Sequence, residues 1–229
     1  MTAPDLSPRH VLDRTFAALR ADLPAYVLLT LVLVGVPTVI SDSSLTPGGQ
    51  YGVMVVAGLL EVLLATTLTH SVLARLDGAP VPLAASLRAG LRFWPLAFAV
   101  QLVSGIAVLA GLCLLVVPGV VLALRWLVPV PALMAEGLGV GDSLQRSTEL
   151  TNGSRWPLLA LVLTWAVAFV AVPPLLISAM QDGGAAAWQV AALDMAFDMA
   201  GAMIGAAGLA VLYVELRGPS RRRTGGSGV

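Results

Sequence analysis

The chain alternates long apolar runs with short polar stretches over nearly its whole length. Six runs approach the length that a helix needs to cross the hydrocarbon core of a membrane. The pattern therefore predicts an all-α membrane protein whose six transmembrane helices form three hairpins. The predicted spans cover about 25–40, 51–73, 95–117, 120–134, 157–180 and 185–213.

The composition agrees with this pattern. Apolar residues make up 58% of the chain and charged residues only 11%, whereas soluble domains have about 45–50% and about 25%. Residues 1–217 are expected to form a single polytopic membrane domain, and 218–229 a disordered Arg-containing tail. Six spans and their connections leave no room in 229 residues for a separate soluble catalytic domain.

All thirteen basic residues are arginines, and twelve of them fall in four polar stretches. The other turns contain no arginine. Because cytoplasmic loops are enriched in arginine and lysine, the spacing predicts that both termini and the arginine-containing turns face the cytoplasm. The twelve are Arg9, Arg14 and Arg20; Arg75, Arg88 and Arg92; Arg146 and Arg155; and Arg217, Arg221, Arg222 and Arg223.

Three of these stretches have the pattern of an amphipathic helix that ends at a proline opening the next span. They are predicted at about 8–22, 82–93 and 142–152. In the first, Leu12, Phe16 and Leu19 line one face. Such helices are expected to lie in the headgroup layer, where arginine reaches lipid phosphates. The alternative is that they only pack against the spans and orient them.

Ionisable residues inside the spans are the main candidates for function, because each costs about 2.5–3.5 kcal/mol at the bilayer centre. Depths counted along straight helices suggest that the side chains of Glu61, Arg125, Asp194 and Asp198 could meet. Arg125 could form a buried ion pair with one of the carboxylates and hold the helices in register. The four side chains could instead form a proton path with a histidine as relay. The candidate polar site is Glu61, His70, Arg125, Asp194 and Asp198.

Small residues in the sixth run predict close helix packing. Gly201 and Gly205 are four residues apart, and Gly208 follows in an Ala-rich stretch. The neighbouring helix could belong to the same chain or to a second copy. Pro129 and Pro131 are expected to bend the fourth span, and the broken backbone there could line a cavity.

No catalytic constellation is recognisable in the chain, so we expect no enzyme activity. A serine elbow, a phosphate-binding glycine loop and a metal-ligand cluster are absent from the sequence, and no cofactor or metal is expected. The single Cys113 lies in an apolar run, and His10 and His70 are poorly placed to share a metal. A net charge of zero gives no sign of nucleic-acid binding.

The stretch VVPGVVLALRWLVPVPALMAEGLGVGDSLQRSTELTNGSRW, residues 116–156, resembles the signature of a bacterial six-span family. This membrane domain is sometimes found fused to glycerophosphoryl diester phosphodiesterases. The resemblance implies a multi-pass protein of the bacterial inner membrane, and it implies no diesterase activity because the hydrolase domain has no room here. The resembling positions include Pro118, Gly119, Arg125, Trp126, Glu136, Ser147, Thr151, Gly153, Arg155 and Trp156, with a closing segment at 213–217.

Two hypotheses about function follow. The favoured one is a non-enzymatic inner-membrane protein that organises the cytoplasmic leaflet or accompanies lipid-handling or envelope proteins. Its partners would be membrane lipids, with a homo-oligomer or a membrane-protein partner also compatible. The alternative is a proton-coupled small-molecule transporter that uses Glu61, Arg125, Asp194 and Asp198. Convergence of these charges on a cavity would favour transport, and a tightly packed bundle would favour the first hypothesis.

Overall fold

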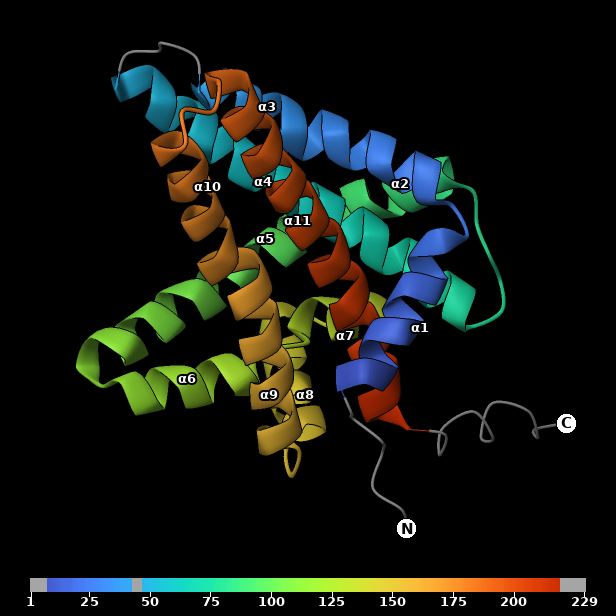
Figure 1. Ribbon diagram of the computed structural model, residues 1–229. Helices are drawn as coiled ribbons and strands as arrows, with labels where there is room; N and C mark the ends of the chain where they lie inside the picture. The colour runs from blue at the N-terminus through green and yellow to red at the C-terminus, as the bar shows by residue number, and fades with distance from the viewer. Residues whose placement is uncertain (1–7, 43–46, 219–229) are drawn as a thin grey trace, which may run out of the picture.

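The computed structural model describes residues 8–42 and 47–218, and all regular structure within these ranges is helical (Figure 1). Six helical segments are long and apolar enough to cross a membrane, which confirms the predicted all-α fold with six spans. The predicted tail beyond Gly218 lies outside the described residues. The spans are Leu23–Ile40, Gly49–Leu76, Leu83–Leu114, Val116–Glu136, Arg155–Asp182 and Ala187–Arg217.

Three spans are single long helices: α4 (Pro47–Leu76), α5 (Leu83–Leu114) and α11 (Ala187–Arg217). Helix α11 packs against α4, against the first span and against α1 (Pro8–Arg20) (Figure 1). Because α1 packs against α11, the first and last described helices lie side by side.

The first and fifth spans each contain one π-helical turn. The first is divided into α2 (Leu23–Thr30), η1 (Leu31–Gly35) and α3 (Val36–Asp42), and the fifth into α9 (Arg155–Ala166), η2 (Val167–Ala171) and α10 (Val172–Asp182). Each π turn ends two residues before a proline, Pro37 or Pro173. Since proline lacks an N–H and its ring crowds the preceding turn, a wider turn lets the helix continue without breaking.

The fourth span is interrupted near its middle. Helix α6 (Val116–Arg125) ends at a short connection, and α7 (Pro129–Glu136) begins with a proline at its first position. Ser147 of α8 (Val140–Thr151) bonds both sides of the interruption. Its hydroxyl donates to the Arg125 carbonyl at 2.9 Å and accepts from the Val128 N–H at 3.1 Å. A hydroxyl therefore replaces the backbone partners that the interruption removes.

The predicted separate helix at 82–93 is wrong. These residues are the first part of α5, which continues through Pro95 into the third span. A break inside the membrane would leave several backbone groups without partners, whereas one internal proline removes a single hydrogen bond, so the continuous helix is favoured. The Trp94 indole N–H donates to the Leu59 carbonyl of α4 at 2.9 Å and holds this part of α5 against its neighbour.

The other two predicted amphipathic helices are separate elements, α1 and α8, and both bury one face against the bundle. On α1 the buried residues are Val11, Thr15, Ala18 and Leu19, while Phe16, which was predicted on the apolar face, is 43% exposed. Thr15 can be buried because its hydroxyl donates to the Val11 carbonyl at 2.7 Å. Small and hydrogen-bonded side chains thus allow closer packing than the large apolar stripe would.

Buried residues concentrate in the second half of α4 and of α11, where Leu64, Leu68, Val72, Ala207 and Val211 form the main core. In contrast, the first half of α4 and the second half of α5 expose large apolar side chains. The α5–α6 hairpin extends to one side of the bundle (Figure 1). Extensive apolar exposure of this kind fits a surface that faces lipid.

Candidate functional site

A cavity of about 420 Å³ lies between α4, α5, α7, the fifth span and α11. We call it the interhelical cavity. Glu61 and Gln101, near the midpoints of α4 and α5, both line it, so it lies at the middle depth of these spans. The other lining residues are Leu64, Ala65, Thr69, Ser104, Trp126, Leu127, Pro129, Val130, Pro131, Trp165, Phe169, Phe197, Asp198, Gly201, Ala202, Gly205, Ala206 and Leu209.

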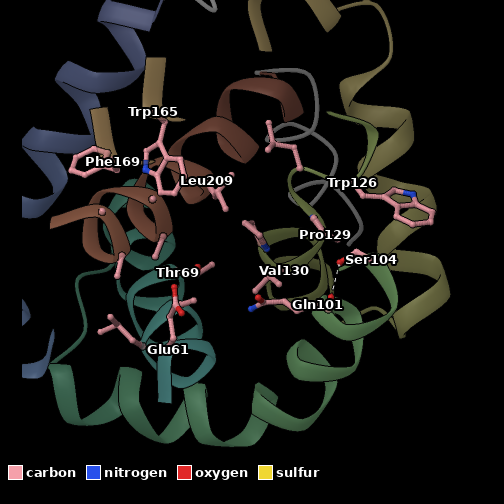
Figure 2. A pocket seen from close by; sticks show the side chains of 18 of the residues that line it. Glu61, Thr69, Gln101, Ser104, Trp126, Pro129, Val130, Trp165, Phe169 and Leu209 are labelled. Carbon is pink, nitrogen blue, oxygen red and sulfur yellow. Dashed lines mark hydrogen bonds between the residues drawn. The ribbon is translucent and has the colours of Figure 1, made fainter. Parts of the chain in front are cut away.

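The polar part of the lining comes from three helices. Figure 2 shows Glu61 and Thr69 of α4 on one side, with Gln101 and Ser104 of α5 nearby. The Ser104 hydroxyl donates to the Gln101 backbone carbonyl at 3.1 Å, and Gln101 itself also lines the cavity. Asp198 adds a second carboxyl group from α11. The cavity therefore offers two carboxyl groups and one amide in a largely apolar lining.

Aromatic side chains form another wall. The rings of Trp165 and Phe169 lie 5.8 Å apart, centroid to centroid, and both line the cavity (Figure 2). They pack on the glycines of α11: a β-carbon on Gly201 would lie 3.3 Å from Phe169, and one on Gly205 would lie 3.5 Å from Trp165. The small residues predicted for helix packing thus make room for aromatic rings of the fifth span in the same chain.

The third glycine of this predicted packing face, Gly208, lies nearest to α1. A β-carbon on Gly208 would lie 3.8 Å from the Thr15 hydroxyl. At the start of α11, two methionines instead pack on the first π turn: a β-carbon on Gly35 would lie 3.3 Å from the sulfur atoms of Met195 and Met199. Helix α11 therefore contacts both π-helical turns and α1.

Only two of the five predicted polar-site residues line the interhelical cavity, namely Glu61 and Asp198. Asp194 lies one turn nearer the start of α11 and is not among the lining residues. The ring nitrogen Nδ1 of His70 lies 3.3 Å from the Ser86 hydroxyl of α5, and His70 is not among the lining residues. The structure thus brings together one carboxyl group from α4 and one from α11.

Arg125 does not line the cavity either. The predicted depth of Arg125 holds for a straight fourth helix, but α6 ends at Arg125. The Arg125 side chain is exposed. Within residues 8–42 and 47–218, no ion pair joins Arg125 to Glu61 or Asp194. The interruption instead gives the cavity Trp126, Leu127 and Pro129, which form part of its lining.

A second polar cluster joins α7, α8 and α11. The Tyr213 hydroxyl donates to the Glu136 carboxylate at 2.8 Å, and the Arg146 Nε–H lies 3.0 Å from both oxygens of that carboxylate. Arg146 also pairs with Glu149 at 3.2 Å. Burial lowers the pKa of the Arg146 guanidinium, but the Glu136 carboxylate outweighs it, so the net pKa lies above its ordinary value. The arginine therefore stays charged and fixes the end of α7.

Two further ion pairs hold the N-terminal helix. Arg14 of α1 pairs with Glu215 of α11, and Arg75 of α4 pairs with Asp22. Arg75 also donates to the hydroxyl of the fully buried Tyr26 at 3.2 Å. These contacts are not predictable from the sequence, because the spacing of the arginines gives no sign of which carboxylates pair with them.

Several residues of the family-like motif lie at the junction of α6, α7 and α8. Ser147 and Thr151 both donate to the carbonyl of Arg125, at 2.9 Å and 3.3 Å, and Glu136 anchors the second polar cluster. Gly119 packs in the α5–α6 hairpin, where a β-carbon would lie 2.6 Å from the Leu112 backbone nitrogen. The motif thus marks where the broken fourth span is held together.

The remaining motif residues lie at the ends of helices. Pro118 is in the first turn of α6, and Gly153 has a positive φ of 89° between α8 and α9. Arg155 and Trp156 begin α9, and Trp156 is 81% exposed.

The fold and the cavity define a multi-pass α-helical membrane protein with a cavity between its helices that is largely apolar and carries two carboxyl groups. Comparison with protein-family models, with curated proteins and with solved structures gives no match. The resemblance to the membrane domain of glycerophosphoryl diester phosphodiesterases stays a prediction.

Proposed function

We propose that this chain is a small-molecule transporter of the bacterial inner membrane that holds its substrate in the interhelical cavity. The observation that carries the proposal is that Glu61 of α4 and Asp198 of α11, both exposed side chains, line one open cavity between the helices. Ionisable groups within spans are costly and typically mark substrate or ion paths. The proposal includes no catalytic step and places both termini in the cytoplasm.

The interrupted fourth span supports this proposal. Transporters commonly bind their substrates near the middle of the membrane, beside helices whose backbone is broken. Here the connection between α6 and α7 lies at the cavity, through Trp126 and Leu127. In addition, Phe169 belongs to the π-helical turn η2, and π turns are frequent at functional sites.

Proton coupling remains part of the proposal, with fewer residues than the sequence suggested. A guanidinium is effectively always charged, whereas a carboxyl group can gain and lose a proton, so Glu61 and Asp198 are assigned this role. Arg125 and Asp194 are left out of the binding site because they do not line the cavity. His70 is left out as a relay for the same reason.

The experiment that tests the proposal measures whether water reaches the cavity. In a Cys113→Ala background, Gln101→Cys places a thiol in the cavity, and Leu109→Cys places one on an exposed part of α5 away from it. A thiol reacts as the thiolate, which needs water, so Gln101→Cys should react with 2-aminoethyl methanethiosulfonate at least about tenfold faster than Leu109→Cys. Equal, slow reaction of both thiols would contradict the proposal.

Leaflet organisation stays a second candidate because of one surface of α1. Arg9, Phe16 and Arg20 are exposed there, a combination that can contact anionic headgroups and acyl chains together. We expect an Arg9→Gln, Arg20→Gln variant to retain less anionic lipid on purification than an Asp13→Asn control on the same helix. Equal retention would remove the support for this candidate.

A further inference from the structure

The lining of the interhelical cavity combines negative charge with aromatic surface. Glu61 and Asp198 contribute carboxyl groups, and the described residues that line the cavity include no arginine, lysine or histidine. Trp165 and Phe169 add aromatic surface to the same lining. Glu61 and Asp198 are the ionisable side chains among the described lining residues, so this lining favours a cation over an anion.

We infer that the cavity binds an amphipathic organic cation, a molecule with one positive charge on an apolar body. This inference rests on the proposed function and specifies its substrate class. The positive charge would neutralise Glu61 and Asp198, whose ionised forms are otherwise costly inside a span. The apolar body would lie against Trp165 and Phe169, whose ring faces also attract cations.

Other ligand classes fit the lining less well. Small metal cations need several oxygen ligands at once, and no group of three or more His, Cys, Asp or Glu side chains gathers among the described residues. An organic anion would place its charge beside two carboxylates without an arginine to pair with. A cavity of about 420 Å³ lies within the range of small-molecule sites, about 300–1,000 Å³.

The test compares two probes of nearly the same shape and opposite charge, tetraphenylphosphonium and tetraphenylborate. Binding is measured by equilibrium dialysis on the purified full chain in phosphatidylcholine nanodiscs, with protein-free nanodiscs as background. We expect saturable binding of tetraphenylphosphonium only. Glu61→Gln and Asp198→Asn should each weaken it by at least about tenfold, because each removes one attractive charge in a medium of low dielectric.

Asp194→Asn is the matched control, since it removes the same charge from the same helix one turn away from the lining. Its binding should stay within about twofold of the unsubstituted protein, because its carboxylate is not in the cavity. The probe comparison on the unsubstituted protein needs no variant, so it remains decisive if one of the substituted proteins fails to fold.

The outcomes separate this inference from the proposed function. Saturable binding of both probes, or binding that neither cavity substitution weakens, overturns the cation preference but leaves a small-molecule cavity. Absence of binding together with fast labelling of Gln101→Cys also overturns the cation preference and leaves the proposed function standing. Absence of binding with slow labelling overturns both.

Discussion

Gly90 of α5 lies against Thr67 of α4 so closely that a β-carbon on Gly90 would be 2.4 Å from the Thr67 hydroxyl oxygen and 3.1 Å from its backbone nitrogen. The Thr66 hydroxyl also lies 3.4 Å from the Gly90 carbonyl oxygen. The two helices therefore meet at the level of their backbones. This contact sets the distance between the two helices that carry Glu61 and Gln101.

Gly90→Ala should destabilise the protein by about 1–3 kcal/mol, because the added methyl group overpacks this contact. The matched control is Gly105→Ala on the same helix, where a β-carbon would meet no atom within 4 Å. The control should be neutral or should stabilise by up to about 1 kcal/mol, since alanine favours a helix over glycine. The measurement is the midpoint of thermal unfolding of the purified protein in detergent.

Adding Thr67→Ala to Gly90→Ala should restore part of the lost stability, because the closest atom, the Thr67 hydroxyl oxygen, is then gone. If the Gly90→Ala variant unfolds at the same temperature as the Gly105→Ala control, the result contradicts a close contact between Gly90 and Thr67.

Ser147→Ala should cost about 1–3 kcal/mol, because it removes the hydroxyl that bonds both the Val128 N–H and the Arg125 carbonyl. Ser143→Ala is the control: Ser143 is equally buried on α8, but its hydroxyl bonds only the Val140 carbonyl of its own helix. Denaturant unfolding of both variants checks the difference. An equal loss of stability in the two variants would show that Ser147 does not hold the interruption of the fourth span together.

Glu136 and Arg146 should show strong coupling in a double-mutant cycle. Their ion pair is largely buried, with the Arg146 Nε–H shared between both Glu136 carboxylate oxygens, so removing one partner leaves the other buried without its counter-charge. We expect a coupling energy of about 1.5–3 kcal/mol for Glu136→Gln with Arg146→Gln. The pair Arg146 and Glu149 serves as control and should couple by less than about 1 kcal/mol, because the Glu149 side chain is 52% exposed.

The six spans could be predicted because apolar runs and arginine spacing reflect the membrane itself, which acts on every residue in the same way. Phe16 shows the limit of this reasoning. Its spacing placed it on the apolar face of α1, but inside a membrane protein both lipid and protein are apolar, so an apolar side chain can face either one. The buried face of α1 carries Thr15 and Ala18, which allow close packing, beside Val11 and the predicted Leu19.

The candidate site was predictable only in part. Glu61 and Asp198, which line the cavity, are predictable because charge within a span is unusual. Gln101 is not ionisable and so gave no such signal, and the aromatic wall gave none because apolar rings are common in spans. The position of Arg125 was wrong because counting along a straight helix takes no account of the break after it. Pro129 and Pro131 predicted a bend in the fourth span, and the structure has the interruption directly before Pro129, with both prolines at the cavity.

The sidedness predicted from arginine spacing can be tested with single cysteines in a Cys113→Ala background. Asp77 lies in the connection between α4 and α5, Asp182 ends α10, and both are exposed. In right-side-out vesicles, a membrane-impermeant maleimide should label Asp182→Cys at once and Asp77→Cys only after detergent is added, because arginine-containing turns stay in the cytoplasm. The reverse order of labelling would place both termini outside, and equal labelling of the two sites in intact vesicles would contradict an odd number of spans between them.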